Sequence, residues 1–146
     1  MRAPDYAGAL IGWRVWRVVR DREGLRLGSV LYDELWSPGR RAVAACRESH
    51  PAPEQACACG FYAAVERRAA LPYLVGREDR GTVGRVLGRV ALWGTVVECA
   101  EGWRGQLAYP VVLLVPDGRA DLAEGLGVYG VPVELVPEPQ RAPVPK

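Results

Sequence analysis

The chain has 146 residues, of which 49% are hydrophobic, and it carries a net charge of +2. This length suits a single domain, and the composition excludes an intrinsically disordered chain. The small net charge gives no general argument for a nucleic-acid or membrane partner.

The first predicted elements are two strands. Residues 12–20 (GWRVWRVVR) and 25–32 (LRLGSVLY) are rich in Trp, Val and Leu, which favours strands, and the DREG between them favours a turn. A second turn is predicted at residues 36–39 (WSPG). Residues 40–46 are compatible with either a brief strand or a helical turn.

The middle of the chain is predicted to hold a helix and then the main strands. Ala, Glu and Arg predominate before a proline, which predicts a helix over about 60–70. The Val- and Leu-rich residues 85–99 and 103–115 predict two long strands joined by a tight connection. Gly88 and Gly94 inside the first of these strands indicate bulges or bends.

The last elements complete a β-rich α+β domain. We predict a short helix over 120–130 and a final strand over 131–136, whereas residues 137–146, with four prolines, favour an extended, flexible tail. The predicted single domain therefore spans residues 1–136. Its fold class is a strongly bent antiparallel sheet or small barrel, with one or two short helices and a zinc-stabilised loop.

The strongest chemical signal is the stretch CRESHPAPEQACACG. It places Cys46, His50, Cys57 and Cys59 within 14 residues, and His50 is the only histidine of the chain. Thiolates and imidazole are ligands that suit zinc, and four of them complete a tetrahedron. The short spacing also keeps the entropy cost of closing the loop small. The stretch therefore predicts a structural zinc site.

Other interpretations of the same stretch stay open. The cysteines could form a redox pair or a disulfide, or could have no joint role. The N-terminus lacks the long apolar region and small-residue cleavage site of a secretory signal, and the chain has no run of about 20 apolar residues that would predict a transmembrane helix. We therefore expect a cytoplasmic protein, in which disulfides are disfavoured.

Glu48 or Glu54 could serve a catalytic zinc, but four ligands in one loop favour a closed site. Cys99 is expected to be a buried thiol, with a replacement ligand as the alternative.

A second feature is the mixture of tryptophan and arginine on the predicted strands. Such side chains stack on bases and bind phosphates or carboxylates when they line a concave face. The alternative is that strand alternation places Trp inward and Arg outward. The candidate ligand-binding residues are Trp13, Arg14, Trp16, Arg17, Trp93, Glu98, Trp103, Arg104 and Tyr109.

Three strings carry a resemblance to a known group of domains: HPAP with CACGFYA at 50–63, LWGTVVE at 92–98, and GWRGQLAYP at 102–110. They resemble a group of small, largely uncharacterised domains from high-GC bacteria, which pair a cysteine loop before a helix with a Trp-Gly strand hairpin. The arginine-rich composition, 18 Arg against one Lys, also indicates a GC-rich coding sequence. The resemblance implies a domain family but assigns no catalytic residue.

Together these features predict a non-enzymatic, zinc-stabilised binding or adaptor domain whose partner is a nucleic acid or a protein. The competing hypothesis is an enzyme with a barrel-like pocket lined by Trp93, Trp103, Arg104 and Tyr109, converging on Glu98 or His50, with or without catalytic zinc.

Overall fold

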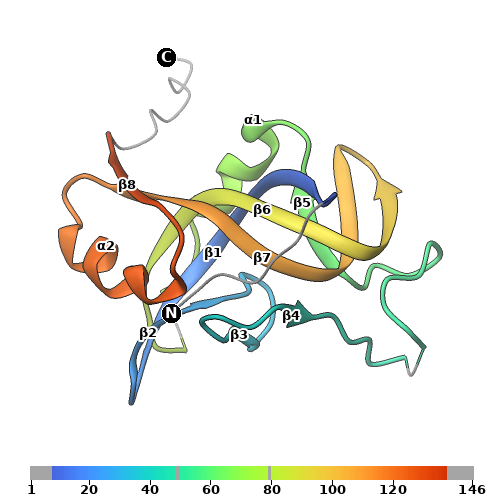
Figure 1. Ribbon diagram of the computed structural model, residues 1–146, viewed down its shortest axis with the longest axis horizontal. Coiled ribbons are helices and arrows are strands. Elements are labelled where there is room, and N and C mark those ends of the chain that lie inside the picture. The colour runs from blue at the N-terminus through green and yellow to red at the C-terminus, as the bar shows by residue number, and fades with distance from the viewer. Residues whose placement is uncertain (1–7, 49, 79, 138–146) are drawn as a thin grey trace.

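The computed structural model describes residues 8–48, 50–78 and 80–137. Figure 1 shows the chain as one bent sheet with short helices at its margins. The strands are β1 (Leu10–Asp21), β2 (Gly24–Gly28), β3 (Leu35–Trp36), β4 (Ala42–Val43), β5 (Phe61–Ala64), β6 (Thr82–Cys99), β7 (Gly102–Pro116) and β8 (Val133–Val136). The helical segments are α1 (Arg67–Ala70), η1 (Leu71–Leu74), α2 (Ala120–Leu126) and η2 (Gly127–Tyr129).

Four strands pair around a ring. β1 pairs with β6, β6 with β7, β7 with β5, and β5 returns to β1, where Trp13 lies opposite Ala64. These pairs are antiparallel, while β8 runs parallel to β7 and makes the sheet mixed. The predicted fold class, a β-rich and strongly bent sheet with two short helices and a cysteine–histidine loop, is confirmed.

The long β6–β7 hairpin was predicted correctly, with its turn at residues 100–101. Gly94 has a φ of +74° and lies within the register shift between Trp93 and Val96, as its position indicated. Gly88 has a different function, because a side chain there would collide with the Val112 carbonyl of β7. The two glycines therefore allow a bend at one position and a close approach of strands at the other.

The predicted helix over 60–70 is wrong for its first half. Residues Phe61–Ala64 form β5, which pairs with β1 and β7, and only Arg67–Ala70 are α-helical before the 3₁₀ turn of η1. Phe61 and Ala63 are buried in the core, so tertiary packing overrides the helix preference of alanine. For residues 40–46, the brief strand is confirmed, as β4.

The predicted helix and final strand of the C-terminal part are confirmed. α2 with η2 occupies the predicted helix, and β8 lies within the predicted final strand. Residues 138–146, which make up most of the predicted flexible tail, lie outside the described part of the chain.

The core lies inside the ring and continues under α2, which contacts β2, β7 and β8. Its fully buried members include Trp16, Leu27, Val86, Val90, Leu113, Leu122 and Leu126. Among the described residues, no helix is long and apolar enough to cross a membrane. The loop between β4 and β5 projects from one end of the molecule, and α2 lies at the other end (Figure 1).

Candidate metal centre

The four predicted ligands converge in the loop between β4 and β5. We call residues 44–60 the metal loop; Ser49 within it lies outside the described residues. The Sγ atoms of Cys46, Cys57 and Cys59 and a ring nitrogen of His50 all lie within 4.8 Å of one another. All four side chains belong to half-buried residues. The arrangement is therefore positioned to hold a metal ion.

Two of the interatomic distances can be compared with a tetrahedral zinc centre. Zn–S and Zn–N bonds of about 2.3 and 2.05 Å imply separations of roughly 3.8 Å between two sulfurs and roughly 3.6 Å between sulfur and nitrogen. Cys46 Sγ lies 3.7 Å from Cys57 Sγ and 3.4 Å from His50 Nε2. These two separations are close to the edges of such a tetrahedron.

The imidazole of His50 is oriented by its own backbone neighbour. Its Nδ1 lies 3.0 Å from the Pro51 carbonyl oxygen, which can only accept, so Nδ1 carries the proton and donates. The lone pair is then on Nε2, which faces Cys46. This is the usual arrangement of a metal-ligating histidine, whose second nitrogen donates to a carbonyl. The Pro51 carbonyl, and next the Cys57 thiol, raise the pKa of His50 above its ordinary value.

Backbone N–H groups of the metal loop point at two of the sulfurs. The Cys59 N–H, and next His50 and Cys46, lower the pKa of Cys57 to about 7. The Glu48 N–H lies 3.4 Å from Cys46 Sγ and lowers the pKa of that thiol, but burial and the neighbouring Cys57 and Cys59 thiols raise the pKa overall. Such N–H donors favour thiolate, which is the form of cysteine that binds metal.

The ring of strands anchors the metal loop at both ends. At its start, the Ala44 N–H donates to the Gln106 carbonyl over 2.8 Å. Further along, the Gln55 Nε2 donates to the Glu98 carbonyl over 3.1 Å. Arg104, on β7, donates to the carbonyls of Glu54, Gln55 and Cys59. Sequence reasoning singled out Arg104 as a ligand-binding residue but gave no signal that it lies beneath the cysteines.

Cys99 is separate from this cluster. It ends β6, is half-buried and is not part of the ligand group. The exclusion of Cys99 from the ligand set agrees with the prediction, whereas its burial is only partial and not complete as expected.

The tryptophan and arginine candidates do not share one face. Trp16, Arg17 and Tyr109 are buried, whereas Trp13, Arg14, Trp93 and Trp103 are partly buried and Glu98 is exposed. Glu98 and Trp103 are cross-strand neighbours. The expectation that strand alternation turns arginine outward fails for Arg17, which is 1% exposed. The segment after β2 covers it, and its guanidinium donates to the Ser29 and Tyr32 carbonyls and to Thr82 Oγ1.

The residues of the hypothetical enzyme pocket point in different directions. The Tyr109 hydroxyl lies in the core, where it donates to the Tyr129 carbonyl and accepts from the Gly39 N–H. The Arg104 guanidinium is directed at the metal loop instead.

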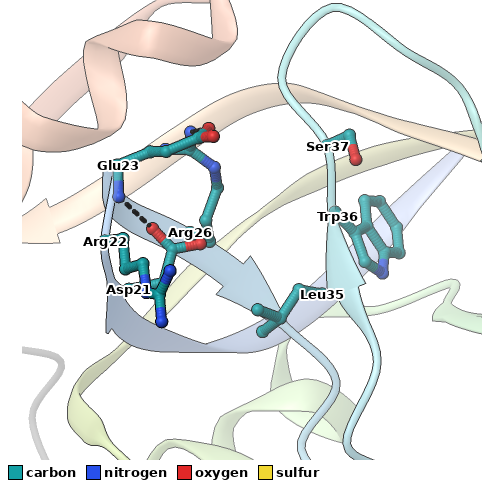
Figure 2. A pocket seen from close by; sticks show the side chains of 7 residues that line it. All are labelled: Asp21, Arg22, Glu23, Arg26, Leu35, Trp36 and Ser37. Carbon is teal, nitrogen blue, oxygen red and sulfur yellow. Dashed lines mark hydrogen bonds and ion pairs between the residues drawn. The ribbon is translucent and has the colours of Figure 1, made fainter.

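A surface pocket is found elsewhere, at the β1–β2 turn and β3 (Figure 2). Charged side chains of both signs line it, and Arg26 and Glu23 form an ion pair at 3.0 Å. Its full lining is Asp21, Arg22, Glu23, Arg26, Leu35, Trp36 and Ser37, which includes none of the candidate ligand-binding residues.

Compared with family models, curated proteins and solved structures, the chain matches none of them. The resemblance to small domains of high-GC bacteria therefore stays a prediction.

Proposed function

We propose that this protein is a zinc-stabilised binding domain in which Cys46, His50, Cys57 and Cys59 hold one structural zinc ion. The observation that carries the proposal is the gathering of three sulfurs and one nitrogen within 4.8 Å, with the two separations from Cys46 Sγ to Cys57 Sγ and to His50 Nε2 close to tetrahedral edges. Four protein ligands fill the coordination sphere of zinc and leave no position for a reacting water. A structural role therefore fits this donor set better than a catalytic one.

The zinc would stabilise a segment that has little apolar surface to bury. Within the described part of the metal loop, Ala52 and Pro53 are the buried residues, and most of the others are exposed. Metal binding supplies folding free energy that such a segment cannot obtain from a core. The role also fits a reducing compartment such as the cytoplasm, where thiols stay available for metal.

The three arginines singled out for nucleic-acid binding are engaged within the chain and do not support a nucleic-acid partner. All three candidate arginines donate hydrogen bonds to groups of the chain itself: Arg14 to the Tyr62 carbonyl, Arg17 to that of Ser29, and Arg104 to that of Cys59. Nucleic-acid affinity depends on arginines and lysines that are available to phosphates. We therefore expect no salt-dependent binding to a single-stranded oligonucleotide in fluorescence anisotropy. Binding that weakens steeply with salt would favour a nucleic-acid partner instead.

Native mass spectrometry of the purified full chain tests the zinc assignment. We expect one zinc ion per chain, lost with a strong chelator and restored on adding Zn²⁺. Replacement with Co²⁺ adds an optical test, because its absorption bands report tetrahedral geometry and thiolate ligands. A protein without bound metal, with all thiols free and no uptake of Zn²⁺ or Co²⁺, would overturn the proposal.

A further inference from the structure

Arg104 is a buried cation directly beneath the metal loop. It lies on β7 and is 8% exposed. Its Nη1 donates to the Cys59 carbonyl at 2.6 Å and to the Glu54 carbonyl at 3.2 Å, and its Nη2 lies 3.5 Å from the Gln55 carbonyl. One guanidinium therefore binds the segment 54–59 at both ends, on either side of Cys57.

The chain packs closely around this contact. Gly60, which follows the last cysteine, has a φ of +103°, and a side chain there would lie 2.8 Å from Pro53 Cβ and 3.2 Å from Arg104 Cβ. The turn out of the metal loop into β5 thus needs glycine for both its conformation and its space. The stem of Arg104 forms part of the surface against which the metal loop folds.

The charge of Arg104 has no acidic partner in the described part of the chain, where no ion pair includes it. Carbonyl oxygens satisfy its N–H groups but do not neutralise a charge, and a buried charge is costly unless it is compensated. Three thiolates, one neutral imidazole and a divalent cation carry −3 and +2, which leaves −1. The occupied centre would supply the missing counter-charge.

We propose that Arg104 is the positioning residue of the metal centre, which holds segment 54–59 in the metal-binding conformation and compensates the single negative charge of a Cys₃His centre with a divalent cation. This inference rests on the proposed zinc-binding function. It assigns two separable roles to one side chain. The N–H groups of the guanidinium hold the carbonyls of segment 54–59 in place, and the positive charge favours the thiolate form of the ligating cysteines.

The test is a metal titration of the full-length chain with four substitutions. Arg104→Met removes both the guanidinium N–H donors and the charge. Arg104→Lys keeps the charge but loses the planar arrangement of the guanidinium donors. Arg89→Met and Arg89→Lys are the matched controls, because Arg89 lies on the neighbouring strand β6, half-buried over the Trp13 ring at 5.1 Å. Zn²⁺ affinity is measured by competition with a chromophoric chelator, and the pH midpoint of Co²⁺ binding is followed through the thiolate-to-cobalt absorption band.

We expect Arg104→Met to weaken Zn²⁺ binding by about 10–100-fold, the usual effect of removing a group that supports metal ligands. Its pH midpoint should move upward, because protons compete better for thiolates without the nearby positive charge. Arg104→Lys should lose affinity with a smaller shift of the pH midpoint. A merely structural role of Arg104 would move the pH midpoint only as far as the loss of affinity itself requires, so each variant is titrated at a Co²⁺ concentration set to the same multiple of its own dissociation constant at high pH.

The outcomes separate this inference from the proposed function. If the wild-type chain binds neither Zn²⁺ nor Co²⁺, the zinc proposal itself fails. If the wild type binds metal and Arg104→Met matches Arg89→Met in affinity and pH midpoint, only the assignment of Arg104 is overturned. Should Arg104→Met not fold, Arg104→Lys decides: affinity below that of Arg89→Lys supports the positioning role, and equal affinity overturns it.

Discussion

The metal loop and the interior of the strand ring are ordered by different physical means. Inside the ring, Trp16, Val86 and Val90 are fully buried, and apolar burial stabilises the packing. In the metal loop, the cysteines and His50 are only half-buried, and hydrogen bonds to neighbouring strands fix the backbone. The same chain thus contains one region that folds around a core and one that we expect to need a metal.

Each region is also in contact with an enclosed arginine, and the two arginines differ in what surrounds them. The Arg14 guanidinium lies 5.2 Å from the Trp36 ring and 5.9 Å from the Phe61 ring, and donates to the Tyr62 carbonyl and Ser29 Oγ. Burial lowers the pKa of Arg14 to about 10, against the opposing effect of Glu34. Aromatic faces support Arg14, whereas backbone carbonyls of the metal loop support Arg104. A buried arginine on a strand is therefore not by itself a ligand-binding residue.

The sharpest way to break the ring is to remove Trp16. Its indole packs edge-on against Trp36 at 5.4 Å and is fully buried, so Trp16→Ala leaves a large cavity. We expect the free energy of unfolding to fall by about 3–5 kcal/mol, with the whole fold affected. Denaturant unfolding followed by circular dichroism measures it. A loss below about 1 kcal/mol would show that the interior is not the main source of stability.

Cys57→Ser should unfold the metal loop and leave the ring of strands folded. Because removing a supporting group already costs 10–100-fold in metal affinity, loss of a ligand should cost more than about 100-fold. We expect the stability to fall by about 2–3 kcal/mol, the upper part of the usual range for one substitution. Cys99→Ser is the control, since Cys99 lies outside the ligand group, and it should keep the metal and change the melting temperature less.

Hydrogen exchange locates the damage in Cys57→Ser. Faster exchange should be confined to the metal loop, while amides of β1, β6 and β7 keep their protection. Equal melting temperatures for Cys57→Ser and Cys99→Ser, or a general loss of protection, would contradict the division into two regions.

The sequence predicted features that local residues determine. The ligand cluster could be found because its four members lie within 14 residues, and the β6–β7 hairpin because its strands are adjacent in the chain. β5 was mistaken for helix because its strand character comes from pairing with distant β1 and β7. The contact of Arg104 with Cys59 spans 45 residues and follows from that same pairing. No local pattern contains this information.

Tyr129 provides a smaller test of the ring. Its hydroxyl donates to the Trp36 carbonyl at 2.6 Å and accepts from the Leu27 N–H at 2.7 Å, so it links η2 to β2 and β3. Tyr129→Phe would leave both backbone groups without this partner in the core, at a cost of about 1–3 kcal/mol. Metal affinity should not change, because these contacts lie away from the metal loop. A change in metal affinity would mean that the two regions are not independent.

The smallest expected effect comes from alkaline pH, which should weaken the ring through Tyr129. Burial raises the pKa of this phenol well above its ordinary value of 10, although the Leu27 N–H opposes the shift. The unfolded chain then ionises at a lower pH than the folded one, so the stability contributed by the neutral phenol is complete below pH 10 and falls above it. Between pH 8 and 11 the loss should be on the order of 1 kcal/mol.

Other groups titrate in the same range. Arg14 contributes with the opposite sign, because its pKa is lowered in the folded protein, and Tyr62 contributes with the same sign, because burial raises its pKa. The informative quantity is therefore the difference in unfolding free energy between the wild type and Tyr129→Phe at each pH. That difference should shrink by about 1 kcal/mol from pH 8 to pH 11 if burial of the phenol is what shifts its titration. A constant difference would show that the Tyr129 hydroxyl ionises as readily in the folded chain as in water, and that this end of the ring is open to solvent.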